Sequence, residues 1–546
     1  MKRKHQNNNS SNESELLQLA ITLEHDYNNA QQTIELPSGE SITKEQLLLK
    51  VIDLHPNYGN AYCKLALILK SENRSSVILQ SGLSMTVQQL YLKAIEYDST
   101  NSNSYNNAGN LSIGESIIQP DGQSMIQQLY LKSIESYPTS SRFYNNLAIV
   151  LSSDESITLL NGQTMTKRQL CMKAIECDPT NSNTYFNLAT MLSNGETITL
   201  PNEQSMTGQQ LYLKSIECDP KKSDAYFNLA CLLSTSESIA LNDGQSMTKQ
   251  KLYLKSIELD PFDSSSYYML STTLSNGESI ALNNGHLMTK QQLLLKAIEY
   301  NPTNSNAFNR LATTLSNGES ITLLNGQLMS KQQLYLKSIE LDPTNSRAYY
   351  NLANTLSNGE SITLNNGQSI TKQLILLVAV DLDSTISNYY NNLATTLELS
   401  KSITLNNGRT MTEQQLYLKA IECDPTNTYS YSNLATTLSY SESITLNSGQ
   451  SMTVRQLYLK VIEIDPTDSY SYKNLANILS RHEIITLHGD VPMTKQQLLL
   501  ESLRYDQTQT SSYRSIGLLL LNNKQTITLP NGKRMSRRQL LQRARE

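Results

Sequence analysis

The hydrophobic positions of this chain follow one pattern that returns every 41 residues, as from Lys296 to Lys337. Residues 349–356 carry apolar or small side chains at the i, i+3, i+4 and i+7 positions of one helical face. Residues 362–371 alternate apolar and polar side chains on both sides of an Asn-Gly pair, which indicates a β-hairpin. The apolar run after Thr289 again has helical spacing. Each repeat is therefore predicted to consist of helix A, a hairpin and helix B.

Helix B carries start and stop signals of its own. Thr289 and Gln292 match the capping box, in which two side chains satisfy the free N–H groups at a helix start. Helix B is predicted to end at Asp342-Pro343, because proline disfavours helical backbone in the residue before it. The same capping pair recurs at Thr166 and Gln169, Ser330 and Gln333, Thr412 and Gln415, Thr494 and Gln497, and Ser536 and Gln539.

A fixed period of this length is typical of repeat arrays, in which each repeat buries its apolar face against its neighbours. The predicted fold is mainly α, an α-solenoid of about 13 repeats that begins near Glu13 and ends at Glu546, with degenerate first and last repeats. Residues 1–12, rich in Asn and Ser, are expected to be a disordered tail, and residues 13–546 the repeat domain. Residues 374–385 match the pattern least well, so we expect a joint there.

Composition narrows the class of function. Charged residues make up 17% of the chain and the net charge is -5, so the basic stripe of a nucleic-acid groove is not expected. No apolar run reaches the roughly 18 to 20 residues of a membrane span, and the first residues lack the apolar segment of a signal peptide. An intracellular, cytoplasmic protein without membrane contact is predicted. Lys2, Arg3 and Lys4 leave a nuclear location open.

Signatures of catalysis are not found in the sequence. It contains no phosphate-binding glycine loop, no zinc-type spacing of Cys or His, and no His-Glu-x-x-His motif. The six histidines occupy different positions of the repeat. We therefore predict a non-enzymatic protein with no catalytic residues, no metal site and no cofactor.

The repeat resembles the tetratricopeptide repeat. The resemblance lies in the aromatic-x-Asn-Leu-Ala phrase of residues 349–353 and in the phrase of residues 335–343 that ends in Asp-Pro, and it covers almost all of the chain. It implies a right-handed superhelix whose helices A line a concave groove, and a protein-binding scaffold. The family's repeat has about 34 residues, so the hairpin accounts for the extra length. The opening aromatic recurs at Tyr62, Tyr105, Tyr144, Tyr185, Tyr226, Tyr267, Phe308, Tyr349, Tyr390, Tyr431, Tyr472 and Tyr513.

One polar position of helix A, between the aromatic and Leu-Ala, is the candidate binding site. The row is similar to the asparagine ladder of the O-GlcNAc transferase repeat domain, which implies that it holds the backbone of an extended peptide. An amide suits this role because it offers one acceptor and two donors. Alternatively, these asparagines cap local backbone or reflect a general asparagine bias. The predicted peptide-binding residues are Asn107, Asn146, Asn187, Asn228, Arg310, Asn351, Asn392, Asn433 and Asn474.

Other functions stay open beside this scaffold. A hairpin has two strands about 4.8 Å apart, so consecutive hairpins would need roughly 9.6 Å each. Packed helices are roughly 8 to 10 Å apart. Neighbouring hairpins could therefore join into a ribbon whose edge self-associates in a structural assembly. A regulatory arm related to O-GlcNAc transferase, without its catalytic domain, is a further alternative.

Basic residues suggest two more alternatives. A clamp for a chaperone tail would need several basic residues in helices A, where only Lys64, Arg310 and Lys473 stand. The C-terminal cluster is either a solvated cap or a site for an acidic partner. It comprises Lys533, Arg534, Arg537, Arg538, Arg543 and Arg545.

Overall fold

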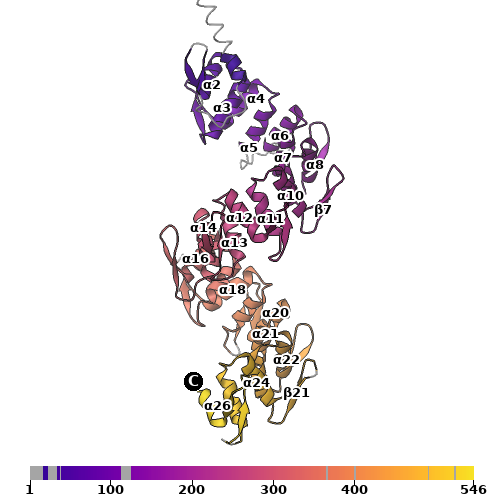
Figure 1. Ribbon diagram of the computed structural model, residues 1–546, viewed down its shortest axis with the longest axis vertical. Helices are drawn as coiled ribbons and strands as arrows, with labels where there is room; N and C mark the ends of the chain where they lie inside the picture. Colours follow the sequence, from indigo (N-terminus) through magenta and orange to yellow (C-terminus); the bar gives the residue numbers. More distant parts are fainter. Residues whose placement is uncertain are drawn as a thin grey trace, which may run out of the picture. The chain divides into compact units, whose positions relative to one another are not determined.

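The computed structural model describes residues 16–22, 33–36, 39–111, 125–364, 367–398, 401–489, 491–521 and 524–545. Helices and hairpins alternate along the chain as the repeat pattern predicts, so the fold is an α-solenoid of helix A, hairpin and helix B repeats (Figure 1). We number the repeats so that repeat 8 contains α15 and α16, and repeat 13 contains α25 and α26. The predicted tail, residues 1–12, lies outside the described residues.

The labelled elements fall into three sets. Helices A after the first repeat are α3 (Gly59–Ser71), α5 (Ser102–Leu111), α7 (Ser141–Val150), α9 (Ser182–Thr190), α11 (Ser223–Leu232), α13 (Ser264–Thr272), α15 (Ser305–Thr313), α17 (Ser346–Ala353), α19 (Ser387–Ala394), α21 (Thr428–Thr436), α23 (Ser469–Ile478) and α25 (Thr510–Leu519). Helices B are α2 (Lys44–Leu54), α4 (Val87–Tyr97), α6 (Met125–Ser136), α8 (Lys167–Cys177), α10 (Gly208–Cys218), α12 (Lys249–Leu259), α14 (Lys290–Tyr300), α16 (Lys331–Leu341), α18 (Lys372–Leu382), α20 (Glu413–Cys423), α22 (Val454–Ile464), α24 (Lys495–Tyr505) and α26 (Arg537–Arg543). The hairpins pair β1 (Thr33–Glu35) with β2 (Ser41–Thr43), β3 (Ser76–Ile78) with β4 (Ser84–Thr86), β5 (Ser156–Thr158) with β6 (Thr164–Thr166), β7 (Thr197–Thr199) with β8 (Ser205–Thr207), β9 (Ser238–Ala240) with β10 (Ser246–Thr248), β11 (Ser279–Ala281) with β12 (Leu287–Thr289), β13 (Ser320–Thr322) with β14 (Leu328–Ser330), β15 (Ser361–Thr363) with β16 (Ser369–Thr371), β17 (Ser402–Thr404) with β18 (Thr410–Thr412), β19 (Ser443–Thr445) with β20 (Ser451–Thr453), β21 (Ile484–Leu487) with β22 (Val491–Thr494), and β23 (Thr526–Thr528) with β24 (Arg534–Ser536).

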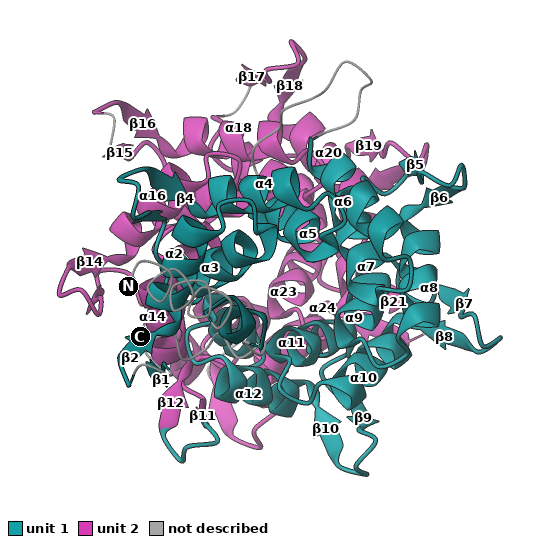
Figure 2. Cartoon of the chain, turned by 90° about the horizontal axis from the view of Figure 1, so that it is seen from above, with its two compact units in different colours: residues 1–273, 281–286 teal, residues 274–280, 287–546 magenta. Residues whose placement is uncertain are grey.

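The chain forms two compact units, residues 1–273 with 281–286 and residues 274–280 with 287–546. In the first compact unit, helices α3, α5, α7, α9 and α11 lie on the inner side, helices B lie outside them, and the hairpins project farthest out (Figure 2). The division falls in repeat 7 and not at residues 374–385, where a joint was expected. There α18 is a complete helix that packs against α17 and α19.

The core is a continuous row of helix contacts rather than a central cluster. Within each compact unit, helices A pack against helix B of their own repeat and helix B of the preceding repeat, as α17 does against α18 and α16. Neighbouring helices A also touch, as α15 and α17 do. Leu352 of α17 and Leu334 of α16 are fully buried in these contacts. Burial of such side chains against adjacent repeats is what stabilises a solenoid.

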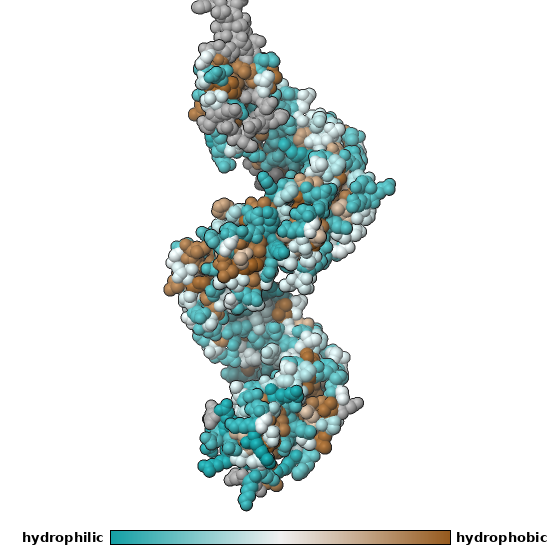
Figure 3. Space-filling view, in the orientation of Figure 1, coloured by the Kyte–Doolittle hydropathy of each residue, from teal (hydrophilic) through white to brown (hydrophobic). Residues whose placement is uncertain are grey.

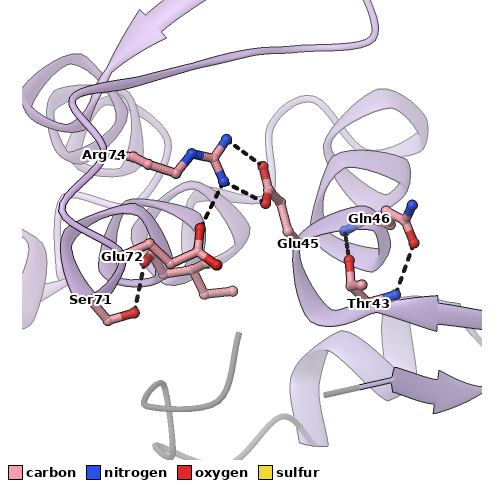
Figure 4. Close-up of polar contacts among 7 residues, drawn as sticks. Thr43, Glu45, Gln46, Ser71, Glu72 and Arg74 are labelled. Carbon is pink, nitrogen blue, oxygen red and sulfur yellow. Dashed lines mark hydrogen bonds and ion pairs between the residues drawn. The ribbon is translucent and has the colours of Figure 1, made fainter. Parts of the chain in front are cut away.

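Helix B has the predicted ends, and helix A does not. Helix α14 begins after Thr289, where the capping box with Gln292 is formed, and α16 ends before Asp342. The same capping pair, Thr43 and Gln46, precedes α2 (Figure 4). Residues 349–356 were predicted as helix A, but α17 runs from Ser346 to Ala353. The Asn345 side chain accepts the N–H of Ala348 and so starts the helix earlier.

An arginine after helix A adds an ion pair between adjacent repeats. The guanidinium of Arg74, which follows α3, lies 2.8 Å from the carboxylate of Glu45 in the first turn of α2 (Figure 4). Arg168 and Glu196 form a corresponding pair at 2.7 Å between repeats 4 and 5. These exposed pairs help to fix how adjacent repeats are aligned, and each contributes about 0 to 1 kcal/mol of stability.

Each hairpin is a short, isolated sheet. In repeat 8 the Leu323 N–H donates to Gln327 at 2.8 Å, and Gly326 adopts a positive φ of 85°, so the loop is a three-residue turn with a bulged glycine rather than a two-residue Asn-Gly turn. Met329 pairs with Ile321 and is buried. Every sheet in the described part of the chain has two strands. The prediction that neighbouring hairpins join into a ribbon is therefore wrong. Hairpin tips instead contact helix B of the preceding repeat, as Asn447 does with Glu422.

Candidate functional site

The predicted asparagine row lies on helices A, and its members are half-buried except Asn107, which is buried. In three repeats the side-chain amide donates to an asparagine one helix A earlier. The donors are Nδ2 of Asn187, Asn351 and Asn433, and the acceptors are Oδ1 of Asn145 (2.9 Å), Asn309 (3.0 Å) and Asn391 (3.0 Å). The row therefore links adjacent repeats through amide-to-amide bonds.

Other members of the row make related bonds with different partners. Asn146 donates to Asn106 at 2.8 Å, and Asn392 donates to Asn354 at 2.9 Å. Asn474 donates to the Tyr458 hydroxyl at 3.2 Å. Two of these three acceptors are again amides of the preceding helix A, and the third is a phenol of the preceding helix B.

Asn107 and Asn228 differ from the other members of the row. Asn107 accepts from the Arg142 guanidinium at 3.0 Å. Asn228 occupies the equivalent position of α11, half-buried, and among the described residues no hydrogen bond of its side chain is found. Thus seven of the eight asparagines contact a side chain of a neighbouring repeat, and the local backbone caps considered as an alternative are not what these bonds form.

These bonds leave hydrogen-bonding capacity in the row. An asparagine amide has two N–H donors and one acceptor oxygen. The bond from Asn351 to Asn309 takes up one N–H, and it also sets the direction in which the amide points. The carbonyl oxygen and the second N–H are not consumed by this bond.

Arg310 interrupts the row with positive charge. It is half-buried on α15, and its charge acts on Lys290 of α14. The pKa of Lys290 is lowered first by burial and then by the charge of Arg310. The Lys290 ammonium donates to the Leu274 carbonyl at 2.8 Å. Two cations therefore stand at this point of the row.

A pocket of about 390 Å³ adjoins the last asparagine of the row. Its lining includes Thr436, Tyr440, Tyr458, Asn474 and Asn477. The Tyr440 ring is 72% exposed. Burial raises the pKa of the Tyr458 phenol to about 12, so it stays a neutral hydroxyl at physiological pH. This pocket combines an aromatic wall with two amides.

The basic residues do not form one face. Lys64 is buried, and its ammonium donates to the Ala20 carbonyl at 2.7 Å, so it closes the preceding helix rather than lining a binding face. Lys473 lies 4.0 Å from the centre of the Tyr470 ring. The C-terminal cluster is separate: Lys533, Arg534 and Arg538 are exposed, and the surface around α26 is strongly hydrophilic (Figure 3).

Two further features bear on the classes of function considered. Among the described residues, no group of three or more His, Cys, Asp or Glu side chains is placed to hold a metal ion. None of the helices that the structure describes combines the length and the apolar character needed to cross a membrane.

Sequence reasoning missed the partners of the asparagine row. Asn145 and Asn391 stand immediately before row members, as the doubled asparagines of residues 145–146 and 391–392 show. That doubling was the available signal. Arg142 and Tyr440 carry no repeat signal, because each is a departure from the usual residue at its position.

Comparison with known proteins agrees with the repeat pattern. The family model of the tetratricopeptide repeat matches more than half of the chain, at residues 129–169, 170–210, 211–251, 252–292, 293–333, 334–373, 416–456 and 457–497. No curated protein of similar sequence was found.

Two solved structures are among those that this chain is similar to. YrrB, described as a TPR protein with an unusual peptide-binding site, is 17% identical, covers 40% of this chain and 95% of its own, and has a TM-score of 0.24. Yeast Tom70 is 12% identical, covers 88% of both chains and has a TM-score of 0.27. The family assignment rests on the repeat match: the chain belongs to the tetratricopeptide repeat family, with a β-hairpin inserted between the helices, and is a protein–protein interaction scaffold.

Proposed function

We propose that this scaffold is non-catalytic and binds an extended peptide segment of a partner protein along the row of helices A. One observation carries the proposal: a half-buried amide recurs on successive helices A, and bonds to the preceding repeat hold it in place. An extended peptide presents one N–H and one C=O per residue, and these groups match the amide oxygen and the remaining amide N–H.

The bonds between repeats favour binding because they orient the amides in advance. An amide whose rotation is already restricted loses less conformational entropy when it binds a ligand. Each new hydrogen bond contributes about 0.5 to 1.5 kcal/mol net. Several weak bonds along the row together hold a chain without demanding one sequence.

Sequence preference comes from the interruptions of the row. Arg310, beside Lys290, provides positive charge at the point where an asparagine is replaced. A bound peptide is expected to place an acidic residue there. The Tyr440 pocket, next to Asn474, adds an apolar contact farther along.

The test uses the full chain and peptides selected on it from a phage-displayed random library. Asn351, Asn392 and Asn433 are changed together to Ala, and binding of the selected peptides is titrated. The loss of three bonds is expected to weaken binding by about 1.5 to 4.5 kcal/mol, while circular dichroism stays helical because the side chains are only half-buried.

A matched control separates binding from packing. Asn309→Ala combined with Asn391→Ala removes the partners of Asn351 and Asn433 but keeps the row itself. This variant is expected to lose less affinity than the triple variant. Unchanged affinity in a folded triple variant would exclude the row and leave the hairpin side or the C-terminal basic cluster.

The Arg310→Glu variant tests the expected sequence preference. Selected peptides that carry an acidic residue are expected to bind this variant more weakly, and charge-reversed peptides with Lys in place of the acid more tightly. The difference should shrink at high salt, because exposed charges are screened. Equal affinity for both peptides in both proteins would remove Arg310 from the site.

A further inference from the structure

The hairpin side of the repeats carries its own set of bonds between repeats. The tip asparagine of a hairpin donates to a glutamate of helix B in the preceding repeat. Asn447 donates to Glu422 at 2.5 Å, and Asn242 makes the same bond to Glu217. Lys419 binds the other carboxylate oxygen of Glu422. The tip thereby closes the groove between the hairpin and helix B.

Two repeats have leucine at the position where Asn242, Asn283 and Asn447 make this bond. Leu160 of repeat 4 lines a pocket with Glu135 of the preceding repeat, and Leu324 of repeat 8 lines a pocket with Glu299 of the preceding repeat. Glu299 keeps its lysine, because Lys296 lies 2.7 Å from its carboxylate. A leucine side chain has no N–H, so the second donor to the carboxylate is lost in both repeats.

Pockets open at both of these leucines. The pocket at Leu160 has a volume of about 210 Å³, and the pocket at Leu324 has a volume of about 340 Å³. Buried Ile298, Phe308 and Met329 line the larger pocket together with Leu324, Glu299 and Lys337. Its volume is within the range of about 300 to 1,000 Å³ that is typical of ligand sites.

Further leucines are exposed on β14 of the same hairpin and on β12 of the hairpin before it. Leu324, Leu328 and Leu287 are 52%, 63% and 65% exposed. The positions equivalent to Leu328 hold serine in other hairpins, as at Ser369 and Ser451. Hydrophobic surface gathers on this hairpin side near α16 (Figure 3). Clustered exposed apolar residues, unlike scattered ones, mark an interaction site.

We propose that the groove between hairpin β13–β14 and α14 is a second docking site, occupied by a partner-protein segment in which a large apolar residue is followed by Lys or Arg. The apolar side chain fills the pocket over Phe308 and Met329. The cation donates to the Glu299 carboxylate, in place of the asparagine donor that other repeats supply. Such a charge-assisted bond is stronger than a neutral one, and it sets the direction of the bound segment.

The chemistry distinguishes this segment from the peptide proposed for the row of helices A. The row presents neutral amides and the cations Arg310 and Lys290, whereas the hairpin groove is lined mostly by apolar side chains, with the Glu299 carboxylate and Lys337 beside them. The two sites are expected to select different peptides.

The test is a subtractive selection on the full chain. A phage-displayed random-peptide library is panned on the wild-type protein in the presence of excess soluble Leu324→Asn variant, which removes every peptide that does not depend on Leu324. Leu324 is half exposed, so this variant is expected to fold, and circular dichroism checks it.

Enriched peptides are expected to carry an apolar residue followed by Lys or Arg. Their affinity should fall about tenfold to a hundredfold in Leu324→Asn, and the preference for Lys or Arg over Gln should disappear in Glu299→Gln. The triple Ala variant of the asparagine row should bind them normally, so failure here is distinct from failure of the proposed function.

Three results would overturn the proposal. They are no enrichment over the starting library, enriched peptides that ignore Glu299→Gln, and a concentration-dependent mass in light scattering that Leu324→Asn abolishes. The last result would show that the groove is occupied by a second copy of this chain.

Discussion

The two sides of the repeat use asparagine in different ways. On helices A, amides donate to amides of the preceding repeat, and both partners are neutral and at least half-buried, as Asn351 and Asn309 are. On the hairpin side, the tip asparagine donates to an exposed glutamate that also binds a lysine, as Asn447, Glu422 and Lys419 show. The row on helices A (the inner row) holds asparagine at most of its positions, whereas the tip position of the hairpins (the outer row) varies more. The inner row therefore suits binding that does not depend on sequence, and the outer row suits local specificity.

Both rows depend on the same core, and breaking that core has the largest expected effect. Leu352→Ala removes a fully buried side chain of α17 and should cost about 2 to 5 kcal/mol of local stability. Leu541→Ala in α26 should cost much less, because that half-buried side chain has neighbours on one side of the stack only. Native-state hydrogen exchange measures both losses. Equal losses at the two positions would contradict nearest-neighbour stabilisation.

The inner row is tested by a double-mutant cycle on Asn351 and Asn309. Their hydrogen bond should give a coupling free energy of about 0.5 to 1.5 kcal/mol, measured by hydrogen exchange of α15 and α17. The pair Asn433 and Asn309 serves as the control, because Asn433 bonds to Asn391 instead. Equal coupling in both cycles would mean that the bonds between repeats are not specific.

The outer row is tested by Asn447→Leu, with the smallest expected effect on stability, about 0 to 1 kcal/mol. The pKa of Glu422 lies below its ordinary value because Lys419 and then Asn447 hydrogen-bond to the carboxylate. The variant should move this pKa upward, and NMR titration measures it. Glu258, which keeps Asn283, should not change and is the internal control.

The sign of the pH dependence follows from that lowered pKa. A carboxylate whose pKa is depressed in the folded protein stabilises it above the unfolded pKa of about 4.3, and this contribution is lost as the pH falls through the folded pKa. Asn447→Leu should therefore reduce the loss of stability on acidification around that range. An unchanged acid profile, with an unchanged Glu422 pKa, would show that the tip bond does not form in solution.

The sequence by itself determined the elements whose signals are local. Thr289 and Gln292 started helix B, and Asp342-Pro343 ended it, because capping bonds and the steric effect of proline act within three or four residues. The 41-residue period determined the solenoid in the same way, since each repeat meets only its neighbours. The early start of helix A was missed although Asn345 is a local cap, because attention to apolar spacing placed the helix on residues 349–356.

Only the tertiary structure decided which side chains meet between repeats. Asn351 and Asn309 are 42 residues apart and Glu299 and Leu324 are 25 apart, so their contact depends on how one helix pair is rotated against the next. The hairpins show the same limit: their spacing allowed a ribbon, but tips such as that of Asn447 contact helix B and every described sheet keeps two strands. Periodicity states what recurs along the chain, whereas the packing angle between repeats selects the partners, and that angle is a property of the assembled core.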